Sequence, residues 1–221
     1  MTGEIRVRQR EISGRRVHWH EVGRGPAVVL IHGSPLSGWS FRRQMRVLGK
    51  RCRVLAPDLL GFGESEGPAS GAGFETQARV LGAWLDALGV ENLRLLGQDW
   101  GGPIAVRCAV ERLDQIEKLA LMNTSFRPDF RPPAYWRPFV SGALGELLVV
   151  RLRAVQLVLP LMMEAARKDP EVRRRYLSNL NRKPTRRAVL ALEQLTEYEA
   201  ATRRIIEQME KEGVISAANH V

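Results

Sequence analysis

The segment Gly97-Gln98-Asp99-Trp100-Gly101 decides how this 221-residue sequence is interpreted. It follows the apolar run Leu93–Gly97 and precedes Gly101–Glu111, whose apolar residues have helical spacing. Glycines on both sides of Asp99 permit a sharp strand-to-helix turn, and this is the nucleophile-elbow pattern with Asp in the place of the commoner Ser. The alternative is that Asp99 only caps the helix, but capping does not require two flanking glycines. The segment therefore favours Asp99 as a nucleophile on an elbow.

Short apolar runs alternate with helical patterns on both sides of this segment. The predicted strands are Val28–His32, Arg53–Pro57, Leu93–Gly97 and Ile116–Met122, and the predicted helices are Trp39–Leu48, Phe74–Leu88 and Gly101–Glu111. Such alternation predicts an α/β fold with a mostly parallel sheet covered on both faces. Upstream, Ile5–Ile12 and Arg16–Val22 flank Ser13-Gly14 and predict an antiparallel hairpin.

The sequence changes character after Asn123. Phe126–Pro138 is rich in proline and aromatic residues, and no strand pattern occurs between Arg127 and Gly213. We expect residues 1–125 to form the N-terminal part of the α/β core and residues 126–213 to form a helical lid over the strand ends, where open parallel sheets place their active sites. Residues 214–221 are expected to be a short tail.

Composition excludes several classes of protein. Hydrophobic residues make up 44% of the chain, which is enough for a packed core. The formal net charge of +10 invites a nucleic-acid interpretation, but the basic residues are scattered, and we predict no nucleic-acid partner. The longest basic clusters, Arg173-Arg174-Arg175 and Arg186-Arg187, are interpreted as solvated helix faces.

The sequence also bears on the cellular location of the protein and on its cofactors. Two distant cysteines match no metal spacing, the N-terminus has no apolar leader pattern, and charged residues interrupt Ala143–Met163, the most apolar stretch. We therefore expect a reduced, cytoplasmic protein without a transmembrane span, a metal or a cofactor.

Two further segments carry chemistry. His32-Gly33-Ser34-Pro35 follows the first parallel strand, where hydrolases of this architecture place one backbone N–H of the oxyanion hole, and the residue after the nucleophile supplies the other. The predicted oxyanion donors are Ser34 and Trp100. In Pro57-Asp58-Leu59-Leu60-Gly61-Phe62-Gly63-Glu64-Ser65, Asp58 and Ser65 are interpreted as structural residues that hold a tight loop.

Together HGSP, PDLLGFGES, GQDWGGPIAVR and LALMNTSF resemble the α/β-hydrolase superfamily, and within it the haloalkane dehalogenases. The resemblance covers residues from about Arg16 to Asn123 and the lid only loosely. It implies that the Asp99 carboxylate displaces a halide from saturated carbon and forms a covalent alkyl ester, which water then hydrolyses. It also implies that the Trp100 indole binds the halide. Trp136, the only Trp of the lid, is the candidate for a second halide ligand, with a core aromatic as the alternative.

Two other functions stay open. Epoxide hydrolases also use an Asp elbow, and they would need lid tyrosines such as Tyr135, Tyr176 and Tyr198. The partners would then be a small haloalkane or epoxide together with water. Ser34 stands where many dehalogenases carry Asn, and Asn123 stands where some relatives carry the catalytic acid.

The family continues beyond the lid with two more strands that carry the acid and the base histidine. Neither strand is recognisable here, and His220 lies one residue from the end of the sequence. A terminal dipeptide rarely holds a catalytic group. The sequence therefore also suggests a truncated, catalytically incompetent remnant, with a sheet edge exposed to pairing in a dimer.

Overall fold

The computed structural model describes residues 3–132, 134–140, 142–162, 164–193 and 195–212. In these residues one sheet has the strand order β1-β2-β4-β3-β5-β6. Its strands are β1 (Arg6–Ile12), β2 (Arg15–Val22), β3 (Ala27–Ile31), β4 (Arg53–Pro57), β5 (Leu93–Gln98) and β6 (Ile116–Met122). The pairs β3–β4, β3–β5 and β5–β6 are parallel, whereas β1–β2 and β2–β4 are antiparallel. The predicted mostly parallel sheet and the N-terminal hairpin are confirmed.

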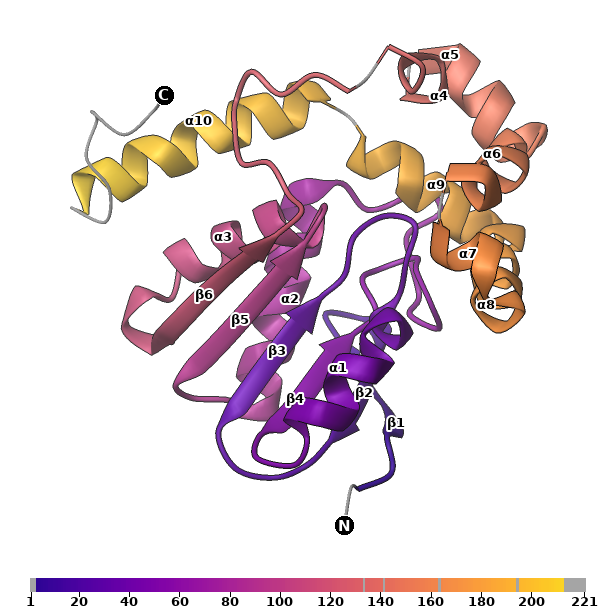
Figure 1. Ribbon diagram of the computed structural model, residues 1–221. Helices are drawn as coiled ribbons and strands as arrows, with labels where there is room; N and C mark the ends of the chain where they lie inside the picture. The colour runs from indigo at the N-terminus through magenta and orange to yellow at the C-terminus, as the bar shows by residue number, and fades with distance from the viewer. Residues whose placement is uncertain (1–2, 133, 141, 163, 194, 213–221) are drawn as a thin grey trace.

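Helices cover both faces of the sheet. A short 3-10 turn, η1 (Gly38–Phe41), leads into α1 (Arg42–Leu48), which lies in front of β4 and β2 in Figure 1. Behind the sheet are α2 (Phe74–Leu88) and α3 (Gly101–Val110). Because β5 lies between β3 and β6, the turn that follows β5 is flanked by the ends of these two strands.

A helical layer follows β6, and the described residues beyond Met122 contain no strand. Its elements are α4 (Arg137–Val140), α5 (Gly142–Gly145), the π-helical stretch η3 (Glu146–Arg151), α6 (Ala154–Met162), α7 (Glu164–Lys168), α8 (Pro170–Asn181), α9 (Lys183–Leu192) and α10 (Leu195–Lys211). In Figure 1 this layer lies over the ends to which the strand arrows point. The division at residues 125 and 126 stays a prediction, and the tail 214–221 with His220 lies outside the described residues.

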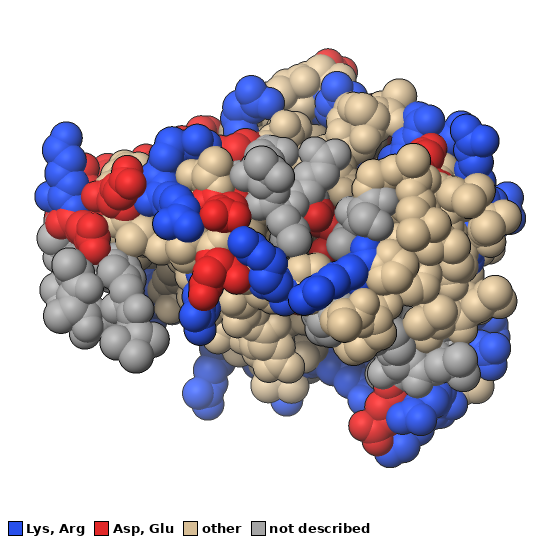
Figure 2. All heavy atoms as spheres, turned by 90° about the horizontal axis from the view of Figure 1, so that it is seen from above, with Lys and Arg blue, Asp and Glu red and all other residues tan. Residues whose placement is uncertain are grey.

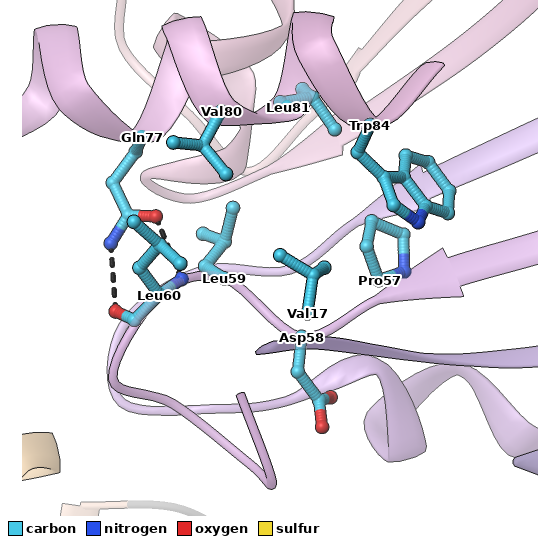
Figure 3. A pocket seen from close by; sticks show the side chains of 9 residues that line it. All are labelled: Val17, Pro57, Asp58, Leu59, Leu60, Gln77, Val80, Leu81 and Trp84. Carbon is cyan, nitrogen blue, oxygen red and sulfur yellow. Dashed lines mark hydrogen bonds between the residues drawn. The ribbon is translucent and has the colours of Figure 1, made fainter. Parts of the chain in front are cut away.

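The Gln77 side chain of α2 binds both backbone polar groups of Leu60, as a neighbouring strand would. Its amide Oε1 accepts from the Leu60 N–H at 2.8 Å, and its Nε2 donates to the Leu60 carbonyl at 2.9 Å. Figure 3 shows this pair at one end of a pocket and the buried Trp84 at the other end. Trp84 packs edge-on against Trp19 with ring centroids 5.8 Å apart. Because Gln77 is only 1% exposed, water cannot replace it as a partner. Gln77 thereby fixes the start of the loop Leu59–Ser65 against the core.

Replacing Gln77 with leucine is expected to lower the free energy of unfolding by about 2 kcal/mol, because it leaves a buried N–H and a buried C=O of Leu60 unpaired. Urea denaturation of the two proteins measures the change. Gln208→Leu, at an exposed position of α10, is the control and is expected to change stability by less than about 0.5 kcal/mol. Equal stability of Gln77→Leu and wild type would contradict the interpretation.

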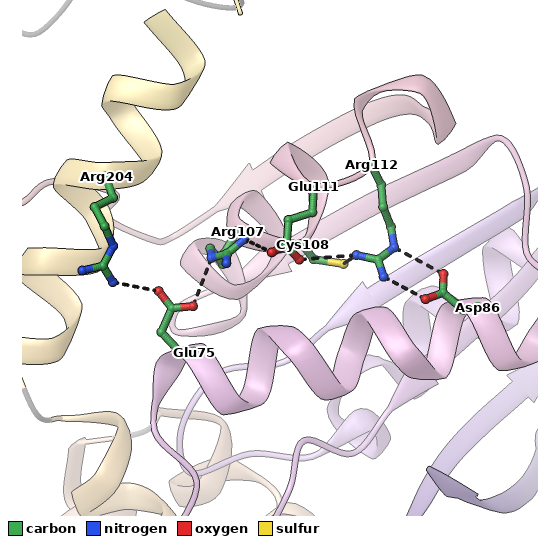
Figure 4. Close-up of polar contacts among 7 residues, drawn as sticks. All are labelled: Glu75, Asp86, Arg107, Cys108, Glu111, Arg112 and Arg204. Atoms are coloured by element: carbon green, nitrogen blue, oxygen red, sulfur yellow. Dashed lines mark hydrogen bonds and ion pairs between the residues drawn. The ribbon is translucent and has the colours of Figure 1, made fainter. Parts of the chain in front are cut away.

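A chain of ion pairs joins α10, α2 and α3 (Figure 4). Glu75 at the start of α2 accepts from Arg107 of α3 at 3.1 Å and from Arg204 of α10 at 3.4 Å. Further along, Asp86 of α2 pairs with Arg112 at 2.9 Å. Each pair is partly exposed, so each contributes less than about 1 kcal/mol, and their main effect is to orient the helices.

The basic clusters agree with the predicted solvated faces only in part, since Arg175 and Arg187 are half-buried and Arg186 is buried. Figure 2 shows Lys and Arg interspersed with Asp and Glu over the helical layer. Arg173 and Arg174 are exposed, in agreement with a solvated face. Arg186 is not: its side chain is 5% exposed, and its guanidinium donates to the carbonyls of Val150, Leu180 and Asn181. The prediction that Arg186 lies on a solvated helix face was wrong because η3 and α8 cover this side of α9.

The strand β6 forms one edge of the sheet in the described residues. Its apolar side chains Leu119, Leu121 and Met122 are 38%, 47% and 39% exposed. An exposed apolar edge strand can pair with another chain, and the dimer through this edge stays a prediction. Within the described part of the chain, no helix combines the length and the apolar character that a membrane crossing requires.

Candidate active site

Asp99 lies on the turn between β5 and α3 with a φ of +53°. This left-handed conformation is unfavourable for a residue with a Cβ by roughly 1–2 kcal/mol, so neighbouring contacts must hold it. The Asp99 carbonyl accepts from the Thr124 hydroxyl at 2.6 Å and from the Gly102 N–H at 2.9 Å, and the Asp99 N–H donates to Met122. The predicted sharp turn at Asp99 is confirmed, and it is held from the end of β6 as well as from its own helix.

Both predicted oxyanion donors face the Asp99 carboxyl group. The Ser34 N–H donates to Asp99 Oδ1 at 3.0 Å, and the Trp100 N–H also donates to the carboxylate. Burial raises the pKa of Asp99 above its ordinary value, while these two hydrogen bonds act in the opposite direction and favour the ionised form. The site thus combines a desolvated carboxylate with two backbone donors.

Gly33 lets the oxyanion loop approach Asp99. A Cβ at this position would overlap the Asp99 carboxyl group and its Cβ. Glycine at position 33 is therefore a steric requirement of the close approach between two loops, whose contact residues Ser34 and Asp99 are 65 residues apart in the sequence. The bond from Ser34 to Pro35 is cis.

Gly33→Ala is expected to slow covalent reaction at Asp99 by about 100-fold, because an added methyl group must push the loop or the carboxylate out of register by a large fraction of an ångström. Mass spectrometry of the protein after exposure to a primary bromoalkane measures the rate. Gly3→Ala, where a Cβ meets only ordinary contact with Val22 at 3.7 Å, is the control. An unchanged rate in Gly33→Ala would contradict the role of the close approach.

The two predicted halide ligands meet at one carboxyl group that the sequence analysis missed. The indole N–H of Trp100 donates to Oε1 of Glu193 at 3.1 Å, and the Trp136 side chain donates to the same carboxyl group. Glu193 follows α9 and is 8% exposed. Burial, with a smaller contribution from the negative charge of Asp99, raises the pKa of Glu193 to about 7.

Trp136 is half-buried and stacks on Phe139 with ring centroids 5.1 Å apart. It is therefore both a packed aromatic and a hydrogen-bond donor. A signal for Glu193 was present in the sequence: Arg186, Val189 and Glu193 have the spacing of one helix face, and that face is buried.

A cavity of about 320 Å3 adjoins Asp99. It is lined by Asp99, Trp100, Pro103, Asn123, Thr124, Ser125, Phe130 and Tyr198. Tyr198 is 2% exposed, its hydroxyl donates to the Ser125 carbonyl at 2.8 Å, and its ring meets that of Trp100 edge-on at 5.2 Å. The cavity is large enough for a small organic molecule beside the carboxylate.

No described histidine is placed to act as a base at Asp99. His32 is fully buried, its Nδ1 bonds to the Gly33 carbonyl at 2.8 Å, and its Nε2 accepts from the Leu59 N–H at 3.0 Å. Both ring nitrogens are thus used by the backbone. His18 and His20 lie on β2, and burial lowers the pKa of His20 to about 4. Asn123, which lines the cavity, is neutral, so the acid and base stay unassigned.

Asp58 and Ser65 hold the loop after β4, as the sequence analysis predicted. The Asp58 carboxylate accepts from the N–H groups of Gly38 at 2.7 Å and Glu64 at 2.9 Å, and the Ser65 hydroxyl donates to the Asp58 carbonyl. Burial raises the pKa of Asp58. Among the described residues no cluster of three or more His, Cys, Asp or Glu side chains could hold a metal ion.

Comparisons with known proteins place the chain in a fold family. A family model described as the alpha/beta hydrolase fold matches residues 26–187. Haloalkane dehalogenase 2 of Mycobacterium tuberculosis is 44% identical over 115 residues, which are 51% of this chain and 40% of that protein. A soluble epoxide hydrolase of Corynebacterium sp. is 35% identical over 123 residues, 56% of this chain and 43% of that protein. These matches span less than half the length of the curated relatives.

Structural similarity to solved proteins covers more of this chain than sequence similarity to the curated relatives does. The crystal structure of haloalkane dehalogenase DatA from Agrobacterium tumefaciens matches 93% of this chain and 75% of its own with a TM-score of 0.81 at 24% identity. At that identity the match shows the fold alone. The helical layer therefore has its counterpart in solved structures.

Proposed function

Because the chain belongs to the α/β-hydrolase fold family, we propose that it is a hydrolase that forms a covalent alkyl ester on Asp99, with small haloalkanes as its substrates. The observation that carries the proposal is the buried carboxylate on a strained turn, with the N–H groups of Ser34 and Trp100 aimed at it. The similarity to haloalkane dehalogenase 2 over half the chain supports the choice of substrate.

In the first step, an Asp99 carboxylate oxygen attacks the carbon that bears the halogen. The carbon–halogen bond breaks, the halide leaves with the electron pair, and Asp99 becomes an alkyl ester. A carboxylate suits this displacement because it attacks saturated carbon and needs no base to remove a proton. The Trp100 indole, with Trp136 as the second donor, would stabilise the departing halide.

In the second step, water attacks the carbonyl carbon of the Asp99 ester. The negative charge then develops on the ester oxygen, where the N–H groups of Ser34 and Trp100 would stabilise it. The ester bond to the alkyl group breaks, the alcohol leaves, and the Asp99 carboxylate is restored. General-base assistance to water is typically worth 100- to 10,000-fold, and no described histidine supplies it. We therefore expect the ester on this chain to persist, with steady-state halide release near background.

The test is alkylation by a primary bromoalkane followed by intact-mass measurement and peptide mapping. We expect one alkyl group on the peptide that contains Asp99, and none on Asp99→Ala. Mapping of the adduct to another residue, or the same adduct on Asp99→Ala, would exclude Asp99 as the nucleophile. Absence of any adduct on the wild type would favour a non-catalytic remnant.

Epoxide hydrolysis is the second candidate, because Tyr198 lines the cavity beside Asp99 and Trp100 and because two of the similar proteins are named epoxide hydrolases. The Tyr198 hydroxyl would have to leave the Ser125 carbonyl to donate to an epoxide oxygen. Parallel measurement of halide from a bromoalkane and of diol from an epoxide separates the two candidates.

A further inference from the structure

The carboxyl group of Glu193 occupies the point at which two indole N–H groups of the site converge. We propose that Glu193 determines when this site accepts a halide: its carboxylate competes with the leaving halide for Trp100 and Trp136, and its neutral form admits the halide. This inference rests on the proposed function, since it concerns the leaving-group position of the same site.

The competition follows from the chemistry of the partners. An indole N–H can only donate a hydrogen bond, so it binds acceptors, and it favours anions over neutral groups. A carboxylate and a halide are both acceptor-only anions. Glu193 Oε1 lies 3.1 Å from the Trp100 Nε1, and Trp136 donates to the same carboxyl group. A halide can bind these donors only if the carboxylate gives them up or loses its charge.

Among the described residues, the groups that act on the charge of Glu193 are Trp100, Asp99 and Trp136. The charged group that acts on it from another element is Asp99 of the β5–α3 turn, which is also negative. Trp100 and Trp136 are neutral donors. Arg186 of α9, the helix that Glu193 follows, directs its guanidinium to the carbonyls of Val150, Leu180 and Asn181. The Tyr198 hydroxyl of α10 is bound to the Ser125 carbonyl.

Protonation of Glu193 should therefore raise the affinity of the subsite for halide. Burial raises the pKa of Glu193 to about 7. Below that pH the carboxyl group is neutral and can donate its own O–H to a halide beside the indoles. Above that pH two like charges would have to share a site of low polarity, which is unfavourable. The apparent dissociation constant for halide should then rise about tenfold for each pH unit above about 7.

The experiment measures bromide binding through the saturable change in tryptophan fluorescence, at constant ionic strength maintained with sulfate. Wild type, Glu193→Gln and Glu207→Gln are titrated at about one pH unit below and one above pH 7. Glutamine retains the size and an acceptor oxygen but never ionises. Glu207, exposed on α10, is the matched control for the removal of one negative charge. Glu193→Gln/Trp100→Phe tests whether the bromide signal arises at this subsite.

We expect wild type and Glu207→Gln to bind bromide about tenfold more weakly on the alkaline side than Glu193→Gln, and about equally on the acid side. Glu193→Gln should bind with no pH dependence across this window, and the double variant should lose the saturable signal. The same pH dependence in Glu193→Gln as in wild type would overturn the inference. It would also be overturned if the double variant kept the signal, or if none of the proteins bound bromide.

The proposed function and the proposed role of Glu193 can fail independently of each other. If Asp99 gives no alkyl adduct while bromide binding shifts as expected, the subsite is a pH-dependent anion site and the chain is not the proposed enzyme. If Asp99 is alkylated while Glu193→Gln leaves bromide binding unchanged, the proposed function stands and the role of Glu193 does not.

Discussion

Replacing Arg186 with methionine is expected to lower the free energy of unfolding by about 3 kcal/mol. The guanidinium is 5% exposed and donates three hydrogen bonds, at 3.1 Å to Val150, 2.8 Å to Leu180 and 2.7 Å to Asn181. Hydrogen bonds from a charged donor contribute roughly 1.5–3 kcal/mol each. Burial of the charge offsets part of this gain and lowers the pKa of Arg186, so the net loss is smaller than the sum of the three bonds.

Methionine is the informative substitution because it fills a similar volume with no donor. The three carbonyls end η3 and α8, so their loss of partners should loosen the helical layer. Chemical denaturation measures the change. Arg173→Met, at an exposed position of α8, is the matched control and is expected to shift stability by less than about 0.5 kcal/mol. If Arg186→Met were as stable as Arg173→Met, water would have to reach the three carbonyls.

Glu193→Gln is expected to stabilise the protein by about 3 kcal/mol at a pH of about 8 and to have almost no effect at about 4. The pKa of Glu193 is about 7 in the folded protein against the ordinary value of 4.5 for an exposed glutamate. Between these values the folded protein binds a proton that the unfolded chain has lost. The free energy of unfolding of the wild type therefore falls as the pH rises through this window, and it stays low above pH 7.

Glutamine removes that dependence because it is neutral in both states. Urea denaturation of wild type and Glu193→Gln across the window gives the difference directly, since all other titrating groups are common to the two proteins. Glu207→Gln should track the wild type at every pH. A pH-independent difference between Glu193→Gln and wild type would show that the carboxyl group is hydrated in the folded protein.

Local patterns in the sequence were sufficient for the sheet and for the turn that carries Asp99. The predicted strands and helices up to Met122 agree with the structure within one or two residues, for instance Phe74–Leu88 and Ile116–Met122. The exception is the predicted helix Trp39–Leu48, which begins as the 3-10 turn Gly38–Phe41 and becomes α-helical only at Arg42. Apolar periodicity and glycine position express local physics, namely which side of an element is buried and where the backbone must turn sharply. Ser34 and Trp100 could be named for the same reason, because their positions follow directly from the ends of strands.

The environment of the helical layer could not be predicted in this way. Arg186 was interpreted as solvated, and Glu193 was not singled out, although both lie on the buried face of one helix. An amphipathic pattern indicates that a face is covered, but it does not say which element covers it. A polar residue on such a face is therefore ambiguous until its partners are known.

The sequence by itself determined the α/β class, the elbow at Asp99 and the loop that approaches it, because each depends on residues that are close in the chain. The tertiary structure alone decided which side chains share the site. The contact from Trp100 to Glu193 spans 93 residues, and the raised pKa of Glu193 arises mainly from burial between the helical layer and the strand ends. Burial and long-range pairing are properties of the packed molecule, since they depend on which surfaces exclude water together.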